Sequence, residues 1–104
     1  MLTDHRTAQF AALGEQLEEQ YWLYTEELTI LTERLRDAAG EDTVTMATIA
    51  GCRRMLADTA RALRHLAEGR YGSCETCQDA IPIARLEILP QARFCTRCQR
   101  DHPN

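Results

Sequence analysis

Lysine is absent from this chain of 104 residues, so all 12 basic side chains are arginines. The 16 acidic residues outnumber them and leave a formal net charge of −4 at pH 7. This balance argues against a protein that coats nucleic acid, because phosphate binding needs a surplus of positive charge. The charge is also uneven: residues 1–43 hold ten acids and three arginines, whereas residues 44–104 hold six acids and nine arginines.

Long apolar segments are missing as well. No run approaches the roughly 20 apolar residues that a helix needs to cross a bilayer, and no export-signal pattern precedes the polar start. The chain has five cysteines, an odd number. Without an export signal, an odd count fits a reducing cytosol and a metal site better than a set of disulfides. We therefore expect a cytoplasmic protein.

Proline is absent between Asp4 and Ala39, and Gly14 is the only glycine there. Most residues of this stretch are strong helix formers, so it predicts one long helix, capped by Thr3 or Asp4 at its start and by Gly40 at its end. Apolar side chains recur at steps of three and four, interrupted only at Gly14, as in a heptad seam that packs against a partner helix. The seam comprises Phe10, Leu17, Tyr21, Tyr24, Leu28, Leu31, Leu35 and Ala38.

A second helix is expected to begin at Asp42 or Thr43 and to run to Glu68, before Gly69. Because few residues separate the two helices, they must fold back as an antiparallel hairpin. The seam of the second helix again has steps of three and four. It comprises Ile49, Cys52, Leu56, Thr59 or Ala60, Leu63 and Leu66.

Three large apolar residues, Trp22, Leu23 and Ile30, fall beside the first seam. We expect them to cover the C-terminal lobe or the second helix. The alternative is an exposed patch for a partner.

Four of the cysteines form two C-x-x-C pairs, Cys74 with Cys77 and Cys95 with Cys98. Zinc prefers four thiolates at tetrahedral corners, and each C-x-x-C turn supplies two of them. The spacer between the pairs has the length that brings the second turn back over the first. The pattern predicts one structural zinc ion. The alternatives are reduced free thiols or a redox pair, and a redox pair needs a βαβ setting that the pattern lacks.

The remaining metal-binding residue types look structural. Cys52 lies on the seam of the second helix and is expected to pack in the core, the alternative being a redox or dimer-forming role. His102 is expected in a solvated tail, although it could replace a lost ligand. His5 and His65 have no partner at ligand spacing and are expected on helix surfaces.

Together these elements predict a mainly α fold with two parts. Residues 1–68 form a long antiparallel two-helix coiled-coil hairpin with its tip at about 37–47, and residues 69–104 form a small four-cysteine zinc lobe with a short C-terminal tail. No Ser-His-Asp set, glycine-rich phosphate loop or paired carboxylates can be argued from the sequence, and four thiolates leave zinc no open position for catalysis. We therefore do not expect an enzyme.

A helical hairpin followed by Gly69-Arg-Tyr71-Gly-Ser-Cys74-x-x-Cys77 resembles the DksA/TraR family of bacterial transcription factors. The resemblance continues through Ile81, Arg85-Leu86, Pro90 and Cys95-x-x-Cys98. It implies a bacterial cytoplasmic regulator that binds RNA polymerase core rather than DNA. It also implies that the hairpin enters the secondary channel, with the acidic tip near the catalytic magnesium and the lobe on the channel rim. We expect a monomer without membrane contact.

The tip pattern of the family is D-x-x-D-x-A, and the matching stretch here runs from Asp42 through Thr45 to Ala47. The first Asp and the Ala are present, but Thr replaces the second Asp. Asp37 and Glu41 lie close by and could supply the missing charge. A purely structural role for Asp42, as a helix N-cap, stays open.

Well-known members of the family hold the nucleotide ppGpp partly with basic residues at positions that read Gly51, Asp58 and Gln99 here. A strongly anionic ligand needs Arg or Lys at such positions. We therefore expect little dependence on ppGpp, unless a one-turn slip brings Arg54 or Arg61 into play. The rival interpretation of the whole chain is a zinc-clamped adaptor that binds another protein or a ribosome-associated target.

Overall fold

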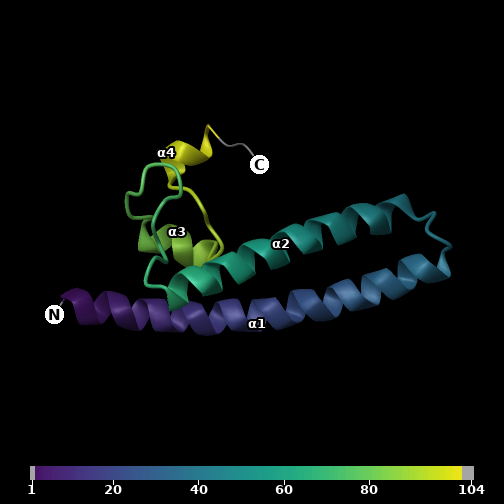
Figure 1. The fold of residues 1–104 in the computed structure, drawn as a ribbon, viewed down its shortest axis with the longest axis horizontal. Coiled ribbons are helices and arrows are strands. Elements are labelled where there is room, and N and C mark those ends of the chain that lie inside the picture. The colour runs from purple at the N-terminus through teal and green to yellow at the C-terminus, as the bar shows by residue number, and fades with distance from the viewer. Residues whose placement is uncertain (1, 102–104) are drawn as a thin grey trace.

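The computed structural model describes the backbone of residues 2–101 and the side chains of residues 7–101. Two long helices, α1 (Leu2–Asp37) and α2 (Thr43–Ala67), pack together as a hairpin, and two short helices, α3 (Ile83–Ile88) and α4 (Thr96–Gln99), lie in the C-terminal lobe. The molecule measures 56 × 29 × 20 Å, with the lobe beside the end of the hairpin opposite its turn (Figure 1). The fold class expected from the sequence is confirmed.

The turn between the long helices is tight and stabilised by backbone geometry. Gly40 has φ +76° and donates its N–H to the carbonyl of Leu35 at 2.9 Å, as expected for a left-handed C-terminal cap. Helix α2 begins at Thr43 after the N-cap Asp42. The expected start of α1 is wrong: the helix begins at Leu2, so Thr3 and Asp4 lie inside it.

The seam of α1 differs from the predicted one near its N-terminal end. Leu13, which the heptad pattern omitted, is buried beside Leu17. Gly14 does not interrupt the packing but permits it, because a Cβ at this position would lie 2.6 Å from Cδ2 of Leu66. At the tip end, Ala38 is exposed rather than packed. At the base of the hairpin, the buried strip of α1 is therefore displaced from the predicted seam toward the lobe.

A single core joins the hairpin to the lobe. Leu13 and Leu17 from α1 and Ala62 from α2 pack with buried residues of the lobe. These lobe residues are Tyr71, Cys74, Ile81, Leu86 and Cys98. Because a two-helix rod has little interior of its own, the lobe supplies much of the apolar surface that buries the base of the hairpin.

Gln91 links all three parts through its buried side-chain amide. Its Nε2 donates to Oε1 of Gln20 on α1 and, at 3.3 Å, to Oγ1 of Thr59 on α2. Thr59 is itself fully buried and donates its hydroxyl to the carbonyl of Met55 at 2.7 Å. This polar contact fixes the position of the lobe on the hairpin, since hydrogen bonds are directional where apolar packing is not.

The expectation that Trp22, Leu23 and Ile30 are covered by the lobe or by α2 is wrong. Their exposed fractions are 68%, 55% and 50%.

Within the part of the chain that the structure describes, no helix is both long enough and apolar enough to pass through a membrane.

Candidate metal centre and hairpin tip

The four predicted zinc ligands converge in the lobe. The Sγ atoms of Cys74, Cys77, Cys95 and Cys98 all lie within 4.8 Å of one another, and those of Cys77 and Cys95 are 3.9 Å apart. Four sulfurs around zinc at about 2.3 Å are separated by about 3.8 Å in a tetrahedron, so these positions fit the ion. The lobe holds one structural zinc ion.

Local backbone geometry aims the first cysteine pair. The N–H of Gln78 donates to the carbonyl of Cys74 at 2.9 Å, and Gln78 takes a left-handed conformation with φ +63°. The chain thereby reverses directly after Cys77. In the second pair the N–H of Gln99 donates to the carbonyl of Cys95, also at 2.9 Å. Both C-x-x-C segments are therefore closed turns that present two sulfurs on one side.

The electrostatics of the cluster favour a bound cation. Burial raises the pKa of the Cys74 thiol, but backbone N–H groups of Cys77, Cys95 and Thr76 outweigh it and bring the pKa to about 6. Burial and the neighbouring sulfurs raise the pKa of Cys98 to about 12. Four thiolates repel one another, and a divalent cation at their centre offsets that repulsion. With all four positions filled by sulfur, the ion is structural rather than hydrolytic.

An ion pair missed at the sequence level ties the two cysteine segments together. The guanidinium of Arg93 donates to both carboxylate oxygens of Glu75, each at 3.1 Å, and the N–H of Glu75 donates to the carbonyl of Arg93 at 2.9 Å. Sequence spacing alone carried no signal for this pairing, because the two residues become neighbours only when the zinc lobe closes.

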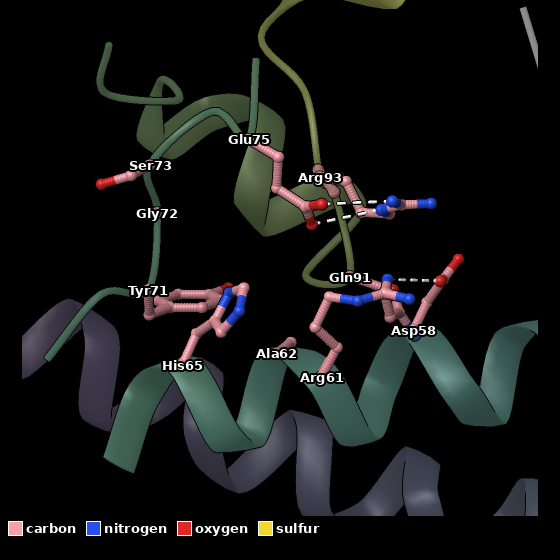
Figure 2. A pocket seen from close by; sticks show the side chains of 11 residues that line it. Asp58, Arg61, Ala62, His65, Tyr71, Gly72, Ser73, Glu75, Gln91 and Arg93 are labelled. Atoms are coloured by element: carbon pink, nitrogen blue, oxygen red, sulfur yellow. Dashed lines mark hydrogen bonds and ion pairs between the residues drawn. The ribbon is translucent and has the colours of Figure 1, made fainter. Parts of the chain in front are cut away.

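Figure 2 shows this pair above α2, where Arg61 donates to Asp58 at 2.8 Å. The space between them and His65 measures about 10 Å³, which suits one water molecule rather than a ligand. The side chain of His65 is half-buried where α2 meets the lobe, instead of lying on an open helix surface. The side chain of His5 and all of His102 lie outside the described residues.

Cys52 lies apart from the metal cluster, in the seam of α2 as predicted. It is buried, and its Sγ lies 3.2 Å from the carbonyl oxygen of Tyr24 on α1. Burial raises the pKa of its thiol, with a smaller contribution from Glu27. A buried thiol held in its neutral form is a core residue rather than a reactive one.

The tip residues surround the α1–α2 turn but differ in exposure. Asp37, Glu41 and Ala47 are exposed, Asp42 is half-buried and Thr45 is buried. The backbone N–H of Thr45 donates to Oδ1 of Asp42 at 3.0 Å, and its hydroxyl donates to Oδ2 at 2.6 Å. Asp42 is therefore a helix N-cap whose two oxygens are both held by one residue.

These bonds also set the charge of the tip. The hydroxyl of Thr45 and then its N–H hold the pKa of Asp42 below its usual value, with smaller contributions from the N–H of Val44 and from Arg34. Asp42 thus carries its charge across the physiological pH range. Thr45 has no exposed group to offer a partner, so its contribution to the tip is to orient Asp42.

The three positions counted for ppGpp are only partly brought together. Asp58 and Gln99 line one cavity of about 370 Å³ between α2 and the lobe, whereas Gly51 does not line it. Arg54, Arg85 and Arg93 also reach this cavity. The carboxylate of Asp58 stands in its wall, and Arg93 is engaged with Glu75.

A helical hairpin that ends in a four-thiolate zinc lobe defines a small C4 zinc-finger protein with a protruding rod. Residues 69–104 match the family model of the prokaryotic dksA/traR C4-type zinc finger. The lobe therefore belongs to that family of zinc fingers.

Comparison with solved structures extends the likeness to the hairpin. The chain is similar to transcription factor DksA2 from Pseudomonas aeruginosa, with a TM-score of 0.79 over 92% of this chain and 84% of that one. The sequence identity is 22%, so this likeness establishes the DksA fold.

Two curated relatives are more similar in sequence but longer. General stress protein 16O of Bacillus subtilis (strain 168) is 33% identical over 73 residues, which cover 70% of this chain and 40% of that protein. An uncharacterized protein of Aquifex aeolicus (strain VF5) is 40% identical over 40 residues, which cover 38% of this chain and 28% of that protein. The chain thus spans less than half the length of these relatives.

Proposed function

We propose that this protein is a bacterial transcription regulator that binds RNA polymerase core directly and inserts its hairpin into the secondary channel. The dksA/traR zinc finger at residues 69–104 and the fold shared with transcription factor DksA2 support a regulatory role rather than an enzymatic one. The single observation that carries the proposal is the shape of the molecule: a thin hairpin with its turn at one end and the zinc lobe at the other (Figure 1). Exposed acidic residues lie at the turn.

The geometry suits insertion into a narrow pore. The 36 residues of α1 give a rod of about 54 Å at 1.5 Å per residue. The lobe widens only the base of this rod, so insertion stops where the lobe meets the pore edge. Because the zinc lobe stiffens the base of the hairpin, the point where the lobe meets the pore edge also sets how deep the tip reaches.

The tip supplies the chemistry. Asp37 and Glu41 are exposed, and Asp42 stays ionised because Thr45 donates hydrogen bonds to its carboxylate. Carboxylates are hard oxygen ligands, so a tip placed beside a catalytic Mg²⁺ perturbs the ligands and waters of that ion. We propose Asp37, Glu41 and Asp42 as the effector charges, Thr45 as the residue that orients Asp42, and Ala47 as part of the same surface.

The test replaces the catalytic Mg²⁺ of purified RNA polymerase core with Fe²⁺, which generates hydroxyl radicals at the active site. End-labelled protein bound to this polymerase is expected to be cleaved within residues 37–47 and to stay intact around residues 60–72. The same complex with Mg²⁺ is the control. Binding without cleavage at the tip would refute insertion, and failure to bind polymerase would favour the adaptor interpretation.

We further propose that regulation is largely independent of ppGpp. The counted positions offer Gly51, Asp58 and Gln99, and a carboxylate at Asp58 repels a polyphosphate. Arg61, one of the two arginines that a one-turn slip would supply, is engaged with Asp58 at 2.8 Å. Transcription by a polymerase without its own ppGpp sites is expected to change little when ppGpp is added with this protein. A severalfold response that Arg54→Ala abolishes would contradict this.

The remaining parts of the proposal follow from charge and composition. A formal charge of −4 disfavours direct DNA binding, which a salt-dependent titration with naked DNA would detect. We propose a monomer in the bacterial cytoplasm, where RNA polymerase is found.

A further inference from the structure

One strip of α1 faces away from both α2 and the lobe and is left uncovered. We define the α1 outer face by the exposed residues of this strip. They are Glu15, Glu18, Glu19, Trp22, Leu23, Glu26 and Ile30. In Figure 1 this helix forms the lower edge of the molecule, with α2 and the lobe on the other side.

Trp22 is the prominent apolar residue of this face. It is the single tryptophan of the chain, and 68% of its surface is exposed. The ring of Tyr21 meets it edge-on, with centroids 5.5 Å apart and an interplanar angle of 88°. This contact supports one side of the indole, so less conformational entropy is lost when a partner covers the other. Exposed, pre-positioned tryptophans are typical anchors of protein interfaces.

The charges around Trp22 define the partner's chemistry. Glutamates stand at i−4, i−3 and i+4 from it, namely Glu18, Glu19 and Glu26, and these are its neighbours on the helix surface. None of the ion pairs formed by described residues uses them. A complementary surface therefore carries arginine or lysine around an apolar depression that accepts the indole.

A shallow groove continues the face toward the N-terminal end. It has a volume of about 400 Å³, with Gly14 and Leu66 among the residues that line it. Glu15 and Glu18 form its wall and lie seven and four residues before Trp22. Leu66 packs into the space that the missing side chain of Gly14 leaves, so it gives the groove an apolar lining that suits an apolar side chain of a partner.

Self-association and membrane binding fit this face poorly. A symmetric dimer through the face would bring its acidic side chains opposite each other, which costs free energy. Anionic lipid headgroups meet the same repulsion. The charge pattern instead favours a different protein with a basic surface.

We propose that the α1 outer face is a docking surface for a basic-rimmed apolar site on RNA polymerase, and that it supplies affinity independently of the tip. This inference rests on the proposed function, because that function names the partner. Trp22 is the anchor, Leu23 and Ile30 extend the apolar contact, and the glutamates steer the encounter. Binding strength and regulatory output are thereby divided between the α1 outer face and the tip of the hairpin.

The test measures binding of purified full-length protein to RNA polymerase core by biolayer interferometry at several salt concentrations. Trp22→Glu is expected to weaken binding at least tenfold, the usual loss when an interface anchor is removed. Ala57→Glu is the matched control, since Ala57 is exposed on α2 and the variant adds the same charge. It is expected to stay within twofold of wild type. The double variant Glu19→Gln/Glu26→Gln is expected to slow association severalfold and to flatten its salt dependence.

Each outcome separates the two proposals. If wild type binds polymerase and Trp22→Glu binds equally well, the docking surface is refuted while the proposed function stands. If Ala57→Glu weakens binding as much as Trp22→Glu, a general charge effect replaces the docking surface. If wild type does not bind polymerase, both proposals fail. A wild-type dimer in sedimentation that Trp22→Glu dissociates would make the face an interface between copies and overturn the inference. Circular dichroism of each variant verifies the helical fold.

Discussion

The contact of Gln91 with both long helices predicts a measurable coupling between the lobe and the hairpin. Gln91→Ala removes the hydrogen bonds to Gln20 and Thr59, each worth about 1 kcal/mol net in a folded protein. The penalty for unsatisfied partners stays small, because Thr59 keeps its bond to Met55 and the half-buried Gln20 can reach water. We therefore expect the free energy of unfolding to fall by about 2 kcal/mol, which lowers the melting temperature by about 10 °C in a chain of this size.

The assay is urea unfolding of the zinc-loaded protein, followed by far-ultraviolet circular dichroism at fixed zinc concentration. Gln16→Ala is the control, because Gln16 is exposed on α1 and its loss is expected to change stability by about 0.5 kcal/mol or less. A double-mutant cycle of Gln91→Ala with Gln20→Ala is expected to give a coupling energy of about 1 kcal/mol. Strict additivity, or a loss for Gln91→Ala no larger than that of the control, would refute the role of this contact in fixing the lobe.

Three further predictions address the metal, the tip and pH. One zinc ion per chain is expected by native mass spectrometry, and Cys74→Ser or Cys95→Ser is expected to unfold the lobe, because metal binding supplies much of its folding free energy. An unchanged near-ultraviolet signal from Tyr71 after full chelation would contradict this. At the tip, Asp42→Asn keeps a good N-cap but removes the charge, so it is expected to alter run-off transcription with less than a tenfold change in polymerase affinity. If run-off transcription with Asp42→Asn equals that with wild type while transcription with Asp42→Ala differs, Asp42 acts only as a cap. Burial raises the pKa of Tyr71 to about 12. The folded state therefore holds this proton more tightly than the unfolded state. The stability that protonated Tyr71 contributes is fully present below about pH 10 and is lost as pH rises toward 12. Tyr71→Phe is expected to reduce that alkaline loss in pH-dependent urea titrations, and an identical pH profile would count against it.

Local rules were sufficient for the elements and for the metal cluster. A glycine at the end of α1 and an Asp before α2 mark the turn, because left-handed backbone and side-chain capping depend on neighbouring residues alone. The four cysteines were identifiable because zinc ligands obey spacing rules within each C-x-x-C turn. The sequence also located the turn around which the proposed tip residues lie, but it could not show that Thr45 is buried with its hydroxyl on Asp42.

The errors of the sequence-based prediction occur where α1 meets other elements. The heptad rule skipped Leu13 and treated Gly14 as a gap, since it assumes one partner helix along the whole length. In the structure the base of α1 meets both α2 and the lobe, so the buried strip broadens there. Trp22 was expected to be covered because it is apolar, yet hydrophobicity alone does not say whether a neighbouring element reaches that side of the helix.

The sequence by itself thus determined a two-helix hairpin, its turn and a four-thiolate zinc lobe, because periodicity, capping and ligand spacing are local properties of the chain. Only the tertiary structure decided how the lobe sits on the hairpin. Gln91 meets Gln20 and Thr59, and Arg93 meets Glu75, across separations that no periodic rule links. The same arrangement leaves the outer side of α1 bare, because the core formed with the lobe lies on the other side of the helix and nothing in the described chain extends around it.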